Sequence, residues 1–96
     1  MKLPVVYIMA NKKNGTLYVG VTSNIQRRVY EHKEGAIDGF TKRYNCKTLV
    51  FYEAHGTMES AILRERKIKG GARKKKIDLI ESINFNWEDL YNDLLT

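Results

Sequence analysis

Apolar and β-branched residues dominate two short segments near the N-terminus, and a polar stretch separates them. Residues 4–10 read PVVYIMA and residues 16–22 read TLYVGVT, a composition typical of strands. Between them, Asn14-Gly15 is the strongest short hairpin signal, because a type I′ turn needs positive φ at both central residues. The pattern therefore predicts an antiparallel hairpin centred on Asn14-Gly15.

The rest of the chain predicts one more strand among several helices. Helix-start residues and terminal glycines delimit the segments, with Thr57 as one expected cap. The predicted order is a helix over residues 23–35, a polar loop over 35–45, a strand over 47–55, and helices over 57–70, 72–83 and 87–95, the last with Asn86 as its N-cap. This order predicts an α+β fold, a small three-stranded, mostly antiparallel sheet flanked by helices.

Pairing the predicted hairpin sorts its side chains onto two faces. One face is entirely apolar and is expected to be core: Val6, Ile8, Ala10, Leu17, Val19 and Val21. The other is mixed: Val5, Tyr7, Met9, Asn11, Thr16, Tyr18, Gly20 and Thr22. Tyr7 and Tyr18 then share a surface, about four rungs or roughly 13 Å apart. Each tyrosine alone is most simply a strand aromatic under a second layer, but Gly20 indicates a bulge or a close approach by a ligand or backbone.

The helix over residues 23–35 has an inward stripe defined by Ile25 and Val29. Arg28 and His32 lie together beside that stripe, whereas Arg27 points to solvent. A single histidine in such a place is more often a core-edge residue than a catalyst. The neighbouring arginine, and Tyr18 on the preceding strand, make a functional cluster a competing interpretation.

A carboxylate interrupts the apolar face of the helix over residues 57–70. Glu65 falls in the middle of the stripe and Lys69 at its edge. Burying a carboxylate is costly unless it is paired or bound to a cation. The alternatives are an ion pair with Lys69 or Arg28, or a metal ligand or catalytic carboxylate. The predicted stripe consists of Met58, Ala61, Ile62, Ile68 and Ala72.

Charge is distributed unevenly along the chain, which has a net charge of +6. Residues 1–76 contain all 17 Lys and Arg and carry +11, whereas residues 77–96 carry −5. A basic body favours a polyanionic partner, most often nucleic acid, although solubility alone would also explain it. The basic run over residues 64–76 would contact phosphates without reading sequence, some of its members being simply solvated. It comprises Arg64, Arg66, Lys67, Lys69, Arg73, Lys74, Lys75 and Lys76.

Length and cysteine usage limit the remaining possibilities. A chain of 96 residues predicts a single domain, here with a core of about residues 4–76 and a helical extension of about 77–96. Cys46 is the only cysteine, which excludes an internal disulfide or a cysteine-based zinc site and fits a cytoplasmic protein. The apolar stretch after Pro4 is too short to span a membrane and lacks a signal-peptide cleavage site.

Taken together and in order, these residues resemble the GIY-YIG nuclease domain. The first element is VYI over residues 6–8 with Tyr7, and the second is YVG over residues 18–20 with Tyr18. The family's arginine, histidine and glutamate fall on Arg28, His32 and Glu65. The similarity covers roughly residues 4–76 and looks closest to the small stand-alone bacterial members, which are similar to the N-terminal nuclease domain of the bacterial excinuclease. That excinuclease branch carries a lysine just after its YIG, where this chain has Val21.

The resemblance implies a metal-dependent endonuclease that hydrolyses phosphodiester bonds, with DNA of the repair or recombination type as the expected partner. It implies that Glu65 holds one Mg²⁺ or Mn²⁺, that Arg28 clamps the phosphate, and that Tyr18 is the general base. Tyr7 would position the water or a phosphate oxygen, and His32 would hydrogen-bond Tyr18 or share the proton transfer. The chain is expected to be a monomer or weak homodimer. The alternative is a catalytically weak or inactive nucleic-acid-binding module on the same fold.

Overall fold

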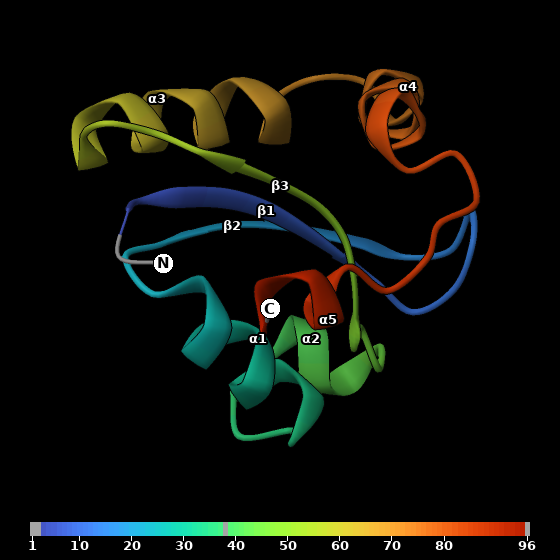
Figure 1. Cartoon of the computed structure of the whole chain (residues 1–96). Coiled ribbons are helices and arrows are strands. Elements are labelled where there is room, and N and C mark those ends of the chain that lie inside the picture. The colour runs from blue at the N-terminus through green and yellow to red at the C-terminus, as the bar shows by residue number, and fades with distance from the viewer. Residues whose placement is uncertain (1–2, 38, 96) are drawn as a thin grey trace.

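Three antiparallel strands form a sheet that lies between two layers of helices (Figure 1). The computed structural model describes residues 3–37 and 39–95. The strands are β1 (Val5–Ala10), β2 (Leu17–Thr22) and β3 (Thr48–Ala54), in the order β2-β1-β3. One face carries α3 (Met58–Lys69) and α4 (Arg73–Ile83), and the other carries α1 (Ile25–Lys33), α2 (Phe40–Arg43) and α5 (Tyr91–Leu94). The predicted α+β fold with a small antiparallel sheet is confirmed.

The hairpin keeps its predicted faces but not its predicted register. Tyr7 pairs with Gly20 and Met9 pairs with Tyr18, two residues away from the expected pairing. The turn is responsible: the Gly15 amide donates to the Lys12 carbonyl at 2.9 Å, so Lys13 and Asn14 are its central residues. Within it only Asn14 has positive φ, at 57°, and the predicted type I′ turn on Asn14-Gly15 is therefore wrong.

An even shift in register leaves every side chain on its predicted face, because successive side chains alternate with period two. It does change distances along the strands. The rings of Tyr7 and Tyr18 have centroids 6.3 Å apart instead of the expected 13 Å or so. The two tyrosines therefore belong to one cluster.

Both faces of the sheet are buried, so β1 is buried at all six positions. The predicted core face is confirmed, and the mixed face is a second core. The cluster toward α3 and α4 contains Val6, Ile8, Ala10, Val19, Val50, Phe51, Ala61, Ile68, Ile80 and Trp87. The cluster toward α1 contains Val5, Tyr7, Met9, Ile25, Val29, Cys46, Leu49 and Leu94, with Tyr18 packed against it. Cys46 is a buried free thiol, and burial raises its pKa.

Helix boundaries follow their capping residues, with two corrections. The Asn24 side chain caps α1 and Thr57 caps α3, as expected for the latter. A short helix, α2, forms inside the region predicted to be a polar loop. Ala72 does not extend the stripe of α3, because that helix ends at Lys69 and Ala72 is the exposed N-cap residue of α4. Among the described residues, no helix is long and apolar enough to cross a membrane.

The segment after α4 starts its last helix later than predicted. That helix begins at Tyr91, and Asn86 does not cap it. Asn84 organises the segment instead: its side chain accepts from the Glu88 amide at 3.0 Å and donates to the Val50 carbonyl at 3.1 Å. Trp87 takes a positive φ of 57°, and its indole is buried in the core toward α4.

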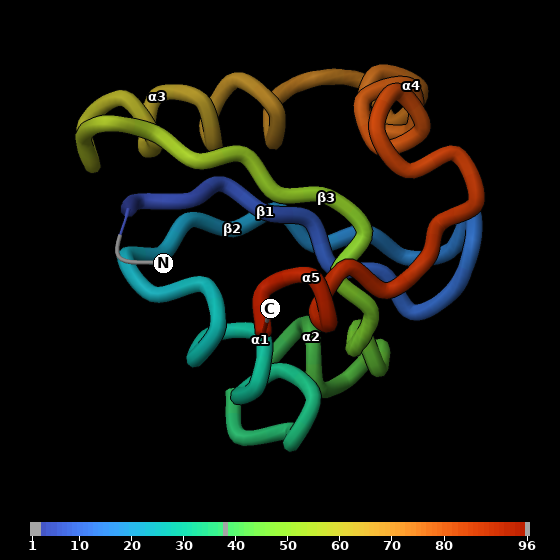
Figure 2. The backbone as a smooth tube through the Cα atoms, in the orientation of Figure 1, coloured from blue at the N-terminus to red at the C-terminus, as the bar shows by residue number. Residues whose placement is uncertain are grey.

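This C-terminal segment runs from the α4 side of the sheet, past β3, to the α1 side (Figure 2). It pairs with the outer edge of β3, where the Leu90 amide donates to the Leu49 carbonyl at 2.8 Å and Asp89 accepts from the Leu49 amide at 3.2 Å. Covering an edge in this way removes a site for unwanted strand pairing. Trp87 packs in the cluster toward α4, and Leu90, Tyr91 and Leu94 pack in or against the cluster toward α1.

Removing the anchor of this segment should be costly. Trp87 is 6% exposed, and its indole nitrogen donates to Glu81 at 2.8 Å. We expect Trp87→Ala to lower the free energy of unfolding by about 3–5 kcal/mol, as for other buried aromatics. Phe85→Ala is the matched control, because Phe85 is 69% exposed and should change stability by less than about 0.5 kcal/mol. Urea unfolding measures both, and equal midpoints for the two variants would contradict the packing described here.

Candidate active site

Gly20 makes room for the ring of Tyr7. The two residues face each other across β1 and β2. A methyl group at position 20 would lie 2.6 Å from both Cζ and the hydroxyl oxygen of Tyr7, far inside van der Waals contact. The close approach that the in-strand glycine predicted is therefore made by a side chain of the same sheet, and it fixes where the Tyr7 hydroxyl points.

That hydroxyl begins a buried hydrogen-bond chain. Tyr7 Oη lies 2.9 Å from Nε2 of His32, and Nδ1 of His32 lies 3.1 Å from Oγ1 of Thr41 in α2. The predicted hydrogen bond between His32 and Tyr18 is wrong, because the register shift brings Tyr7 to the histidine. Tyr18 contacts His32 edge-on instead, with ring centroids 5.5 Å apart. We call Tyr7, Tyr18 and His32 the tyrosine–histidine cluster.

The electrostatics of the cluster keep both hydrogen-bonded groups neutral. Burial, and then the nearby charge of Arg28, lower the pKa of His32 to about 4. Burial, and then Tyr18, raise the pKa of Tyr7 above its ordinary value, although Arg28 opposes this. At pH 7, Tyr7 is therefore a phenol and His32 a neutral imidazole, with one ring nitrogen donating and the other accepting. Of the two tyrosines, Tyr7 is buried, whereas Tyr18 is half-buried and lies next to the surface.

The two adjacent arginines of α1 differ as predicted. Arg27 is exposed and pairs with Glu31, their Nε and Oε2 atoms being 3.3 Å apart. Arg28 is half-buried, and within the described residues its guanidinium has neither an ion pair nor a side-chain hydrogen bond. It lines a hollow of about 250 Å³ at the start of α1, together with Thr22, Asn24 and Glu31, whose carboxylate is paired with Arg27. A partly desolvated guanidinium that makes no ion pair is a suitable partner for an anionic ligand.

Glu65 lies on the sheet side of α3 with its side chain 13% exposed. Its Oε2 is 2.8 Å from Nζ of Lys69, so the ion pair is made with Lys69 and not with Arg28. Its charge is the last of the causes that raise the pKa of Tyr7, after burial, Tyr18 and Glu31. The helix α3 covers the face of the sheet opposite to the tyrosine–histidine cluster (Figure 1), so Glu65 acts on Tyr7 through its charge and not through a direct contact among the described residues.

A metal site built here would have a single protein carboxylate. Across residues 3–37 and 39–95, no group of three or more His, Cys, Asp and Glu side chains is placed to hold a metal ion. Mg²⁺ nevertheless needs only one or two carboxylates when substrate phosphate and water complete its shell. Glu65 is half-buried and is paired with the ammonium of Lys69, whose long side chain can turn away, so the residues present fit such a site.

The basic run is not one uniform phosphate-binding surface. Arg64 is committed to Glu53, with Nε and Oε1 3.0 Å apart, and Lys74 pairs with Asp78 at 3.0 Å. Arg73 and Lys76 donate to backbone carbonyls, of Asn14 and Gly15 and of Gly71 respectively. Within the described part of the chain, the members with no protein partner are Arg66, Lys67 and Lys75, all of them exposed.

Thr41 and Phe40 were not found by sequence analysis. Both lie in α2, which has four residues, too few to show helical periodicity. Thr41 forms a hydrogen bond with the second nitrogen of His32, and Phe40 contacts Tyr18 in a tilted arrangement with ring centroids 6.2 Å apart. The only available signal was indirect, since a buried neutral histidine requires a second hydrogen-bond partner.

Comparison with known proteins agrees with this geometry. The family model of the GIY-YIG catalytic domain matches residues 3–78. This chain belongs to the GIY-YIG family. Nuclease activity is what that family implies. The chain is 37% identical to a UPF0213 protein of Staphylococcus saprophyticus over 71% of its own length and 83% of the relative's. It is 38% identical to a UPF0213 protein of Haloquadratum walsbyi, over 69% and 74% respectively.

A solved structure is similar over nearly the whole chain. The solution NMR structure of a UPF0213 protein from Bacillus halodurans superposes with a TM-score of 0.56, at 29% identity and with 90% of each chain covered. The GIY-YIG resemblance and its small single-domain type are thus confirmed. The roles of Tyr7, Tyr18, Arg28, His32 and Glu65 stay predictions.

The buried histidine makes stability depend on pH. Because its pKa is lower in the folded protein than the ordinary 6.5, the unfolded chain takes up a proton first as pH falls. This contribution is intact above pH 6.5 and is lost as pH falls toward 4. We expect the unfolding free energy of the protein to fall, relative to that of His32→Gln, by ~2 kcal/mol between pH 7 and 4.5. The comparison cancels the pH dependence that arises from carboxylates common to both proteins. If the difference between their unfolding free energies stayed constant with pH, the lowered pKa of His32 would be contradicted.

Proposed function

We propose that this GIY-YIG domain is a metal-dependent endonuclease that hydrolyses phosphodiester bonds in DNA, on repair or recombination substrates. The observation that carries the proposal is Arg28, a half-buried guanidinium that makes no ion pair among the described residues and lies near the tyrosine–histidine cluster. A phosphate in front of it would receive a fork of charge-assisted hydrogen bonds. These bonds would strengthen as charge grows on the phosphate during the reaction.

The two tyrosines take different roles in this proposal. Tyr18 reaches the surface and accepts the proton of the attacking water in its deprotonated form. Tyr7 stays a phenol, because burial raises its pKa. With the hydrogen of His32 on Nε2, the imidazole donates to the Tyr7 oxygen, and Tyr7 can donate its own hydrogen to a phosphate oxygen or the water. His32 is then a positioning residue, held by Thr41.

Glu65 would hold one Mg²⁺ or Mn²⁺. A divalent cation there would supply Lewis-acid stabilisation of the phosphate charge. Lys69 now neutralises the carboxylate and would have to turn outward, which its 57% exposed side chain allows. In that position Lys69 would face a flanking phosphate.

A second candidate is a nucleic-acid-binding module without useful catalysis, and the same ion pair favours it. Glu65 is already satisfied by Lys69 in the structure, so it needs no metal to be stable. The chain also has Val21, packed against the core, at the position that follows YVG. A cleavage assay separates the two candidates.

The test is incubation of the purified protein with end-labelled nicked, flapped, branched and single-stranded DNA, with Mn²⁺ or with EDTA. We expect Mn²⁺-dependent products from at least one substrate. The matched control is Tyr18→Phe, which keeps the ring contacts and removes only the hydroxyl; its rate should fall about 10²-fold or more. Binding without cleavage of any substrate would favour the second candidate, and cleavage by Tyr18→Phe at the full rate would exclude Tyr18 as the base.

Affinity should depend strongly on salt, because counterion release drives binding to phosphates. Lys75 has no protein partner among the described residues, whereas its neighbour Lys74 pairs with Asp78. We expect Lys75→Ala to lower the slope of log affinity against log salt by about one, and Lys74→Ala to lower it less. Fluorescence anisotropy between 50 and 200 mM salt, roughly the range over which phosphate contacts weaken, measures the slopes. A binding constant independent of salt would show that the basic run does not contact the DNA.

A further inference from the structure

Aromatic rings continue from the candidate active site to the surface. Tyr18 contacts Phe40 with centroids 6.2 Å apart, and Phe40 contacts Tyr44 at 4.8 Å. Phe40 begins α2 and Tyr44 follows its last residue, so the two lie four residues apart on the same side of that helix. We call Phe40 and Tyr44 the aromatic platform.

The two rings of the aromatic platform are exposed to solvent. Phe40 is 45% exposed and Tyr44 is 42% exposed, and neither belongs to the hydrophobic cluster beneath α1 and α2, which Phe40 reaches only through Tyr18. Two large rings that contact each other in water without covering a core are surface available to a ligand. The guanidinium of Arg43 lies over the Tyr44 ring at 5.6 Å, which places a cation beside that surface.

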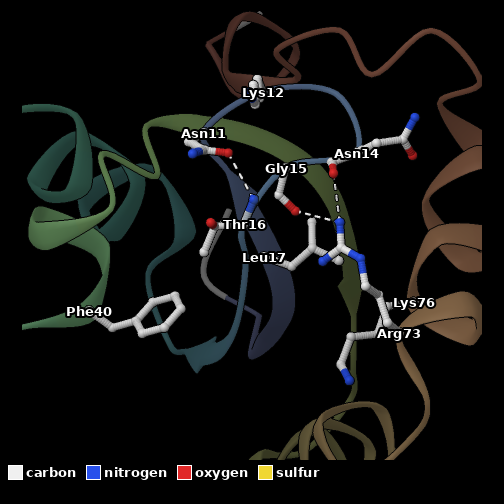
Figure 3. Close-up of a pocket in the computed structure, with 9 residues that line it drawn as sticks. All are labelled: Asn11, Lys12, Asn14, Gly15, Thr16, Leu17, Phe40, Arg73 and Lys76. Carbon is white, nitrogen blue, oxygen red and sulfur yellow. Dashed lines mark hydrogen bonds between the residues drawn. The ribbon is translucent and has the colours of Figure 1, made fainter.

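A cationic cleft adjoins the platform. Phe40 forms one wall of a hollow of about 600 Å³ between the hairpin turn and the start of α4 (Figure 3). Three of its lining residues are cations, Lys12, Arg73 and Lys76, and none of the described lining residues is acidic. Arg73 is fixed there by its hydrogen bonds to the carbonyls of Asn14 and Gly15 (Figure 3). The exposed ring and the cations thus offer a flat apolar contact next to a positively charged channel.

Exposed aromatic rings next to a cationic cleft suit one class of ligand, a nucleotide whose base is unstacked. A base inside a duplex is already stacked and paired, so it cannot lie on a protein ring without being extruded. An unpaired base can, and stacking on aromatic side chains beside a basic groove is how single strands are held. The platform starts one ring from Tyr18, so its occupant would be a near neighbour of the phosphate to be cut.

We propose that the aromatic platform binds the unpaired base of a nucleotide adjacent to the scissile phosphate, with the neighbouring backbone in the cleft of Lys12, Arg73 and Lys76. The preferred substrate is then DNA with a single-stranded segment at the cut, such as a flap or a free single strand. This inference rests on the proposed function, and it adds the substrate class that the basic run alone does not select.

The first test measures binding without cleavage, in EDTA, to a labelled oligothymidine and to a duplex of equal length. Phe40→Ala should weaken binding to the single strand about tenfold and change binding to the duplex less than about twofold. Phe40→Trp should restore affinity, because any large ring can stack. Tyr30→Ala is the matched control, since Tyr30 is a 55% exposed aromatic on α1 outside the platform, and it should behave as the unmodified protein.

The second test removes the base instead of the ring. A single abasic nucleotide is moved along the oligothymidine, and one position should weaken binding to the unmodified protein about tenfold. At that position Phe40→Ala should show no further loss, because ring and base contribute the same contact. If the losses of affinity from the abasic nucleotide and from Phe40→Ala were additive, the platform would not bind that base. The same conclusion would follow if Phe40→Ala weakened binding to single strand and duplex equally. The nuclease proposal would stand in both cases. Absence of any DNA binding would overturn both proposals, and binding of an aromatic-rich peptide in place of DNA would assign the platform to a protein partner.

Discussion

Arg28→Ala should reduce the cleavage rate by about 10²–10³-fold, the usual loss when one donor to a developing negative charge is removed. Arg27→Ala should leave the rate within about twofold, because Arg27 is engaged by Glu31 in solvent. The measurement is a single-turnover rate with Mn²⁺ on the best substrate of the panel. Arg28→Lys keeps the charge but not the planar fork, and an intermediate rate is expected.

The stability of Arg28→Ala gives a control that separates function from folding. Within the described residues, no carboxylate loses a partner when the guanidinium is removed, and a partly desolvated cation disappears. The unfolding free energy should therefore be unchanged or slightly higher. A variant that unfolds much more easily than the unmodified protein would mean that Arg28 supports the fold. Equal loss of cleavage from both arginines would place the phosphate elsewhere.

The spacing of apolar residues along the hairpin strands and α1 correctly predicted the face on which each side chain lies. Val6 and Ile8 were assigned to one core and Tyr7 to the opposite face, because alternation along a strand does not depend on register. The same reasoning separated Arg28 from Arg27 on α1. The helix cap at Thr57 and the turn at Gly35 also follow from local chemistry, since each depends on only a few neighbouring residues.

The distance between Tyr7 and Tyr18, and the partners of His32 and Glu65, could not be predicted from the spacing of residues along the sequence. The hairpin register is set by the Lys12–Gly15 turn, and the Asn14-Gly15 signal placed the centre of that turn one residue too late. That error separated Tyr7 from Tyr18 and assigned His32 to the wrong tyrosine. The partner of Glu65 was open between two cations, because sequence spacing brings Lys69 within reach but does not exclude Arg28. The hairpin turn fixes the register, and the side-chain geometry along α3 selects Lys69 as the partner of Glu65.

Glu65→Gln should abolish metal-dependent cleavage while DNA binding through the exposed lysines and arginines survives. The substitution keeps size and hydrogen-bonding capacity but removes the charge that a hard cation requires. Its cost to stability should be small, about 0–1 kcal/mol, because the lost partner Lys69 is 57% exposed and returns to water. Melting temperature with and without Mn²⁺ reports metal binding directly, since a ligand that binds only the folded state stabilises it. The unmodified protein should melt higher with Mn²⁺, and Glu65→Gln should not.

Lys69→Ala breaks the same ion pair from the other side and is therefore the decisive control. If Glu65 binds the metal, removing its competitor leaves the carboxylate available, so Lys69→Ala should keep or increase the Mn²⁺-induced rise in melting temperature. If the pair is only structural, the two variants should lose equal stability, and neither should differ from the unmodified protein in its response to Mn²⁺. Cleavage by Glu65→Gln at the rate of the unmodified protein would remove Glu65 from the site. Loss of the Mn²⁺ response in Lys69→Ala alone would mean that the lysine, by orienting the carboxylate, is part of the metal site.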